Sequence, residues 1–213
     1  MTYDLITLDV GGTLLYPWPS VGEIYANCFL DHGLDACPNE INQSFKIHWK
    51  KTYLNKPHKT SSEKYWWYKL VELVVADLGE IDDFKGMFDD LWDRFASPEH
   101  WRLYDGVIEQ LEFLKKQNCQ LAILSNWDER LRPLLTELDL NQYFDYIFIS
   151  CEVGVEKPDI KIFKHVEAET KVQSQKILHI GDSDFHDIKG AQSAGWQARK
   201  VKSEARSIDL GFN

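Results

Sequence analysis

A carboxylate stands at the end of the first apolar run of the sequence. Asp9 follows the β-prone residues 5–8, and Gly11, Gly12 and Thr13 come soon after it. This pattern predicts a buried parallel strand that ends in a tight turn. Open α/β sheets bind their ligands at the carboxyl ends of their strands, so Asp9 would lie at such a site. The glycines let the backbone come close to a bound group, and Thr13 offers a hydroxyl and an N–H to an anion.

Three later stretches carry polar residues that match this chemistry. Ser125 ends the apolar run in LAILSNWD, and Lys157 precedes Pro158 in GVEKPD. Asp182 and Asp187 follow the apolar run in ILHIGDSDFHDIKGA. Taken singly, some of these residues could have purely structural roles: Ser125 could cap a helix near residues 128–138, and a lone lysine before a helix is commonly solvated.

The order and spacing of the four motifs resemble the haloacid dehalogenase-like hydrolase superfamily over almost the whole chain. The resemblance is closest to the subgroup of haloacid dehalogenase-like hydrolase domain-containing protein 3, which has a Ser-Asn-aromatic-Asp second motif. It implies that Asp9 is the nucleophile. It also implies that Ser125 and the next backbone N–H, that of Asn126, bind a phosphoryl oxygen together with Gly12 and Thr13. Lys157 would keep the nearby carboxylate ionised and offset the charge of the transferred group.

The resemblance further implies a Mg²⁺ site. Asp9, Asp182 and the backbone carbonyl of Gly11 would hold the ion, and Asp187 would act partly through water or by orienting the site. Three like charges in one pocket are costly without a cation. Oxygen ligands of this kind suit Mg²⁺, so we expect Mg²⁺ as the cofactor.

The first motif departs from the DxDGT pattern of phosphatases in this superfamily, because Gly11 replaces the second acid. In the family that acid protonates the leaving oxygen and then activates water, and such help is worth about 10²–10⁴ in rate. Three interpretations follow. The chain could be a Mg²⁺-dependent phosphatase of a small phosphorylated molecule, slow or helped by another group. It could be a dehalogenase-type hydrolase, or a non-catalytic binding protein on the same fold. The retained acids Asp182 and Asp187 favour the phosphatase.

The elements that must position these residues alternate between strands and helices. Such alternation is typical of an α/β fold with a doubly wound, Rossmann-like parallel sheet. The expected strands cover residues 5–8, 119–124, 145–150, 176–180 and 197–201. We expect residues 203–213 to form a tail.

A helical pattern interrupts this alternation between residues 16 and 98. Four helices are expected over 21–32, 39–53, 63–78 and 82–95, with Ser20 and Asn39 as N-caps. Four helices suit a small bundle. Its place after the first motif corresponds to the cap domain of the superfamily, which closes over the site and selects the substrate. We therefore expect a core domain of 1–15 and 99–213 and a cap of 16–98, with Trp18 as a substrate contact.

The composition narrows the classes of function. The net charge is −10 over 213 residues and no basic patch stands out, which argues against nucleic-acid binding. No apolar run reaches the roughly 18 residues that a membrane helix needs. We see no signal peptide and expect a cytoplasmic protein. The four cysteines form no CxxC pair, so we expect buried thiols in a reducing compartment.

Overall fold

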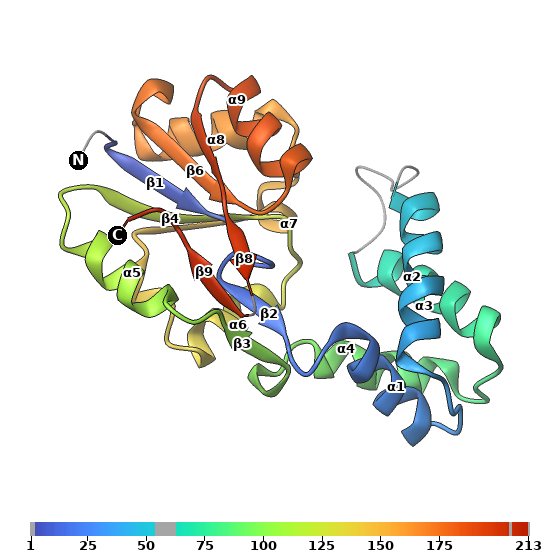
Figure 1. Ribbon diagram of the computed structural model, residues 1–213. Coiled ribbons are helices and arrows are strands. Elements are labelled where there is room, and N and C mark those ends of the chain that lie inside the picture. Colours follow the sequence, from blue (N-terminus) through green and yellow to red (C-terminus); the bar gives the residue numbers. More distant parts are fainter. Residues whose placement is uncertain (1–2, 54–62, 205, 213) are drawn as a thin grey trace. The chain divides into compact units, whose positions relative to one another are not determined.

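The computed structural model describes residues 3–53, 63–204 and 206–212. The chain divides into two compact units, each shown in Figure 1. The sheet unit consists of Met1–Tyr16 and Arg102–Asn213, and the helical unit of Pro17–Trp101. The connecting strands β2 (Leu15–Pro17) and β3 (Trp101–Leu103) pair with each other where the chain passes between the units.

The sheet unit is built on a five-stranded sheet in the order β5-β4-β1-β6-β7. The strands are β1 (Leu5–Leu8), β4 (Gln120–Ser125), β5 (Tyr146–Ile149), β6 (Ile177–Gly181) and β7 (Gln197–Lys200). All neighbours pair in parallel, which confirms the predicted α/β class. The strand order reverses between β1 and β6, and doubly wound sheets bind ligands in the crevice at such a reversal.

Helices flank this sheet (Figure 1). They are α5 (Val107–Lys115), α6 (Leu131–Glu137), α7 (Ser150–Val153), α8 (Ile160–Thr170) and α9 (Gly190–Ser193). Helix α8 shows why they pack: Ile162, Phe163 and Val166 form one buried face against the sheet. A π-helical segment, η4 (Asp184–Lys189), separates β6 from α9. Single π-helical turns of this kind are frequent at functional sites.

The sequence led us to expect a tail over residues 203–213. This prediction is wrong, because the C-terminal residues contain two strands. Strands β8 (Lys202–Glu204) and β9 (Ser207–Asp209) pair in an antiparallel sheet. Ile208 and Leu210 are buried, and the Gln110 amide bonds the backbone of both residues. The apolar signal is too short to identify a strand, because Ile208 and Leu210 are the buried residues among the described part of 206–212.

The helical unit contains α1 (Val21–Asp31), α2 (Pro38–Tyr53), α3 (Glu63–Leu78) and α4 (Phe84–Arg94). Its core contains Ile24, Phe29, Val71, Val74, Leu91 and Trp92. Ser20 caps α1 by accepting from the Glu23 N–H, as predicted. The predicted cap Asn39 is wrong, because α2 begins at Pro38, so Asn39 lies inside the helix. No helix in the described ranges combines the length and the apolarity that a membrane span requires.

Candidate active site

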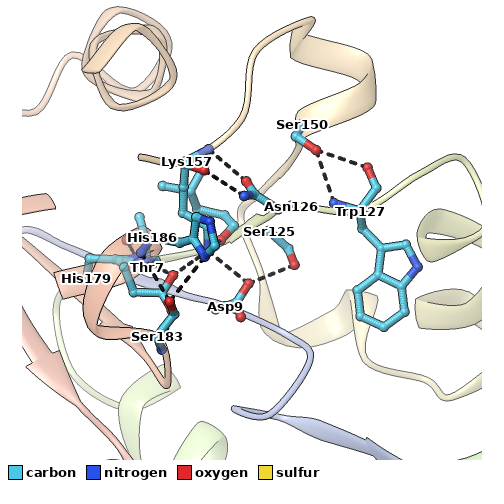
Figure 2. A network of polar contacts seen from close by, with 12 residues as sticks. Thr7, Asp9, Ser125, Asn126, Trp127, Ser150, Lys157, His179, Ser183 and His186 are labelled. Atoms are coloured by element: carbon cyan, nitrogen blue, oxygen red, sulfur yellow. Dashed lines mark hydrogen bonds and ion pairs between the residues drawn. The ribbon is translucent and has the colours of Figure 1, made fainter. Parts of the chain in front are cut away.

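Asp9 lies directly after the central strand β1, and its N–H continues the pairing with the Ile180 carbonyl at 2.9 Å. Its side chain is buried, and Oδ1 accepts two hydrogen bonds (Figure 2). Ser125 Oγ, at the end of β4, donates to it at 2.8 Å, and Lys157 Nζ donates at 2.9 Å. Since both donors bind Oδ1, they orient the carboxylate and leave the other oxygen, Oδ2, for a ligand.

Lys157 is buried at the centre of this group, with only 1% of its surface exposed. Its ammonium donates to Asp9 Oδ1 at 2.9 Å, to Asp187 Oδ1 at 2.6 Å and to the Leu124 carbonyl at 2.8 Å. Burial opposes the charge, but the two carboxylates outweigh it and raise the pKa of Lys157 above its ordinary value. Lys157 is therefore a fully bonded cation.

Asn126 holds the backbone of Lys157 in place (Figure 2). Its amide nitrogen donates to the Lys157 carbonyl and its amide oxygen accepts from the Lys157 N–H, both at 2.8 Å. Neither Ser125 nor Asn126 caps the following helix, because α6 begins only at Leu131 and Ser125 donates to Asp9. The Asn126 side chain is thus engaged in a clamp on the Lys157 backbone.

Asp182 follows β6 and approaches the glycine turn after Asp9. Gly12 has φ +78°, and a Cβ atom there would lie 2.8 Å from Asp182 Oδ2, so only glycine permits this approach. One carboxylate oxygen each from Asp9, Asp182 and Asp187 lies within 4.8 Å of the others. Partial desolvation, together with the negative charges of Asp9 and Asp187, raises the pKa of Asp182 to about 6.

Asp187 accepts hydrogen bonds from three protein groups. Lys157 Nζ and His179 Nε2 contact Oδ1 at 2.6 and 3.0 Å, and the Ser183 N–H donates to Oδ2 at 2.9 Å. Burial alone would raise the pKa of Asp187, but Lys157 and His179 outweigh it and hold that pKa well below its usual range. His179 in turn contacts Thr7 Oγ1 through Nδ1 at 2.8 Å. Asp187 is therefore an ionised carboxylate whose two oxygens accept hydrogen bonds from protein groups.

The sequence patterns did not point to Thr7 and His179. Both side chains are fully buried, and the two residues are paired in register on strands β1 and β6. A signal was available, since each is a polar residue inside an otherwise apolar strand. Thr7 also lies two residues before Asp9, which places both side chains on one face of the sheet.

The charges of this site do not balance within the protein. Asp9, Asp182 and Asp187 face one ammonium, that of Lys157. Burial lowers the pKa of His179, so its imidazole adds no positive charge. Buried like charges are costly without compensation, and hard oxygen donors prefer divalent cations such as Mg²⁺. The donor set fits such a cation, since one oxygen each of Asp9, Asp182 and Asp187 lies within 4.8 Å of the others.

Two further features lie beside Asp9. The Thr13 hydroxyl is buried, and within the described ranges it has no hydrogen-bond partner. A Cβ atom on Gly11 would lie 3.3 Å from Cζ3 of Trp127, so the indole lies against Gly11. The Ser150 hydroxyl fixes Trp127 by accepting from its N–H and donating to its carbonyl, both at 3.1 Å (Figure 2). The site thus combines a buried unpaired hydroxyl with an apolar wall.

The helical unit contains a second group of potential ligands, formed by Cys28, His32 and Asp90. Burial raises the pKa of the Cys28 thiol to about 12.

The prediction that all four cysteines are buried is wrong: Cys37 is exposed, and Cys119 and Cys151 are half-buried. These three lie near the ends of elements, where an apolar run in sequence does not guarantee burial. Trp18 also belongs to the helical unit, where its N–H donates to the His100 carbonyl at 2.8 Å.

Residues 3–195 match the family described as haloacid dehalogenase-like hydrolase. Haloacid dehalogenase-like hydrolase domain-containing protein 3 of Mus musculus is 32% identical over 198 residues, which cover 90% of this chain and 78% of that protein. YfnB of Bacillus subtilis, a HAD-hydrolase whose structure is bound to magnesium, has a TM-score of 0.76 at 20% identity, over 92% of this chain and 87% of that one. L-2-haloacid dehalogenase of Xanthobacter autotrophicus has a TM-score of 0.73 at 18% identity, over 96% and 79%. The two structures show a shared fold.

Proposed function

Because the chain belongs to the haloacid dehalogenase-like hydrolase family, as its motifs predicted, we propose that it is a Mg²⁺-dependent phosphatase. Its substrate would be a small phosphorylated molecule, and Asp9 would be the nucleophile. The observation that carries this proposal is the group of three carboxylates: Asp9 and Asp187 are buried and bonded to Lys157, and the more exposed Asp182 lies beside them. Among the described residues, the two donors to the Asp9 carboxylate both bind Oδ1. A cytoplasmic location for the reaction stays a prediction from the sequence.

The reaction would proceed in two steps at Asp9. Oδ2 attacks phosphorus, an O–P bond forms, and the bond from phosphorus to the leaving oxygen breaks. Ser125 and Lys157 support this step, because their hydrogen bonds to Oδ1 aim the other oxygen at the substrate. Water then attacks the aspartyl-phosphate at phosphorus, which releases phosphate and restores the carboxylate. The Lys157 ammonium offsets the negative charge in both steps.

We propose that Asp9, Asp182 and the Gly11 carbonyl bind Mg²⁺ directly, and that Asp187 supports the site from the second layer. The hydrogen bonds that Asp187 accepts from Lys157, His179 and Ser183 support this division. When bound, the ion would screen the charge between the carboxylate and the phosphoryl group. The magnesium named for the structure of YfnB is in line with this choice of ion.

The phosphoryl group would be bound by the glycine turn and the end of β4. The buried Thr13 hydroxyl would donate to one side of it. The Gly12 N–H donates to the Leu15 carbonyl at 2.8 Å, so Gly12 would contribute by letting the backbone come close to the phosphoryl group. Ser125 and the Asn126 N–H would complete the binding from β4. We further propose that the helical unit is the cap that selects the substrate, with Trp18 as a candidate contact.

Gly11 limits which substrates this site can hydrolyse quickly. It supplies no acid to protonate the leaving oxygen, and the Trp127 ring occupies the space next to it. Leaving groups that depart without a proton, such as a nitrophenolate or an acyl group, should therefore react far better than sugar or alkyl alcohols. The same lack would slow hydrolysis of the aspartyl-phosphate, so a burst of product should precede the steady state.

A panel of phosphate esters and haloacids, run with Mg²⁺ and with a chelator, tests the proposal. We expect Mg²⁺-dependent release of nitrophenol that is lost in Asp9→Asn. Dehalogenation that persists in chelator would replace the proposal by the second candidate, a dehalogenase-type hydrolase, which the missing acid at Gly11 favours. If no Asp9-dependent turnover occurs on any member of the panel, a non-catalytic binding role replaces both.

A further inference from the structure

A polar pair lies in the middle of the sheet, where apolar side chains are the rule. Thr7 and His179 are both fully buried, on the two central strands β1 and β6. Burying polar groups costs free energy unless they are hydrogen-bonded, and an apolar pair would avoid that cost altogether. Such a pair needs an explanation, and its contacts with the site offer one.

The direction of its hydrogen bonds follows from the groups at the far end. The ionised Asp187 carboxylate can only accept, so His179 Nε2, at 3.0 Å, carries the hydrogen. In a neutral ring the other nitrogen, Nδ1, is then an acceptor. The Thr7 hydroxyl, 2.8 Å from Nδ1, therefore donates to it and fixes this tautomer.

Asp187 is confined on its other sides as well. The Ser183 N–H donates to Oδ2 at 2.9 Å, on the oxygen that His179 does not bond. A Cβ atom on Gly181 would lie 2.3 Å from Asp187 Cγ, so the carboxyl group packs directly on the backbone of β6. The remaining contact of Oδ1 is the Lys157 ammonium at 2.6 Å. Asp187 therefore helps to hold the lysine, together with the Leu124 carbonyl, which accepts from the same ammonium at 2.8 Å.

We propose that Thr7 and His179 are positioning residues for the reaction at Asp9. They fix Asp187, Asp187 fixes the Lys157 ammonium, and the ammonium holds Oδ1 of Asp9 so that Oδ2 faces the substrate. Figure 2 shows Thr7, His179, Lys157 and Asp9 in one network of polar contacts, and Asp187 links His179 to Lys157. The inference rests on the proposed function in taking Asp9 as the nucleophile. It adds two residues that touch neither substrate nor metal.

Three variants separate positioning from simple packing. His179→Leu removes the donor to Asp187, and His179→Gln keeps an N–H donor at a similar reach. Thr7→Val keeps the shape of the side chain but removes the hydroxyl. His165→Leu, on α8, is the matched control for losing an imidazole away from the site. Each purified variant is first shown to be folded by circular dichroism and thermal unfolding.

On nitrophenyl phosphate we expect His179→Leu to lower kcat by about 10–100-fold, the range typical of residues that orient a metal site. KM should change little, because the binding groups at Thr13 and Ser125 remain. His179→Gln should recover most of the loss, Thr7→Val should lose less than His179→Leu, and His165→Leu should match the wild type. A folded His179→Leu with wild-type kcat overturns the proposal, and so does a His179→Gln as slow as His179→Leu.

Crystal structures of His179→Leu and His179→Gln test the positioning without turnover. We expect the Lys157 ammonium to leave Asp9 Oδ1 in the first variant and to return in the second. An unchanged lysine in His179→Leu counts against the inference even if the wild type is an active phosphatase. A wild type without phosphatase activity counts against the proposed function, while the displaced lysine would still support the positioning.

Discussion

Among the residues that the structure describes, each unit contains one group of three potential metal ligands, and the two groups differ in their charge balance. Cys28, His32 and Asp90 of the helical unit lie as close together as the three aspartates of the sheet unit. In the helical unit Arg94 bonds both oxygens of Asp90, at 3.1 and 2.9 Å, and Asp31 at 2.6 Å. Its guanidinium holds the pKa of Asp90 below the usual range despite partial burial.

In the sheet unit Asp182 shows the opposite shift, since burial and the charges of Asp9 and Asp187 raise its pKa to about 6. Lys157 bonds both Asp9 and Asp187, but its single positive charge balances only one of the three carboxylates. In both groups the potential ligand atoms therefore lie close together, but only the aspartate group carries uncompensated negative charge. We interpret the helical group as a structural network and the aspartate group as a cation site, because only the second gains from a bound cation.

The largest expected effect is that of Asp9→Asn. An amide is a poor nucleophile and a poorer metal ligand, so turnover should fall by at least about 10⁴-fold. Steady-state rates on nitrophenyl phosphate measure it, after a contaminating phosphatase has been excluded by its inhibitors. Asp90→Asn in the helical unit is the matched control and should keep the wild-type rate. Wild-type turnover in Asp9→Asn would refute the covalent mechanism.

The next effect concerns Gly11 and the Trp127 ring that lies against it. Gly11 is not among the residues with positive φ, so its backbone accepts a side chain and the obstacle is the Trp127 ring at 3.3 Å. Gly11→Asp together with Trp127→Ala should raise turnover of alkyl phosphates by up to about 10²–10⁴-fold, and that of nitrophenyl phosphate by less. Trp127→Ala alone is the control. A folded, Mg²⁺-binding double variant without any gain would point to another proton donor.

Removal of Asp182 tests the excess charge directly. Asp182→Ala should weaken Mg²⁺ binding by at least about 10-fold, because mutation of even an outer-layer residue typically lowers the metal affinity of a site by that factor. Calorimetric titration with Mg²⁺ measures the affinity. Mg²⁺ at 100 times its Kd should also stabilise the wild type by about 2.7 kcal/mol. Equal affinity in Asp182→Ala and the wild type would remove the basis for distinguishing the two groups.

Arg94→Gln tests the helical group. It leaves the carboxylates of Asp31 and Asp90 without their shared cation, and we expect a loss of about 1–3 kcal/mol in the free energy of unfolding. Urea unfolding measures the loss, and turnover on nitrophenyl phosphate should not change. Arg132→Gln, which breaks a more exposed pair with Glu152, should cost less. If both variants lose equally little stability, Arg94 is not what compensates this group.

The smallest effect lies in the pH dependence of Cys28. Its folded pKa of about 12 exceeds the ordinary value of 9.0, so the folded state keeps the proton longer than the unfolded chain. Stability from this thiol is therefore complete below pH 9 and is lost as the pH rises from 9 towards 12. Unfolding curves of Cys28→Ala should show a shallower alkaline slope. Parallel slopes in variant and wild type would contradict the buried, neutral thiol.

The positions of the main acids follow from local patterns. Apolar runs that end in a polar residue identify β1, β4 and β6, and the parallel sheet brings Asp9, Ser125 and Asp182 to one edge. The helical bundle and its aromatic core are likewise visible in the helical periodicity. Such signals lie within a few neighbouring residues, so the sequence alone suffices to predict them.

Contacts between distant residues were decided only by the tertiary structure. Nothing local marks the Asn126 amide as a clamp on the Lys157 backbone, the Trp127 ring as the neighbour of Gly11, or Ile208 as a buried strand residue. The same holds for the charge balance that separates the two ligand groups, because Arg94 and Lys157 compensate carboxylates that only folding brings near them. Residue types and strand ends set which chemistry is available, and the packing of the strands determines which groups are left free to perform it.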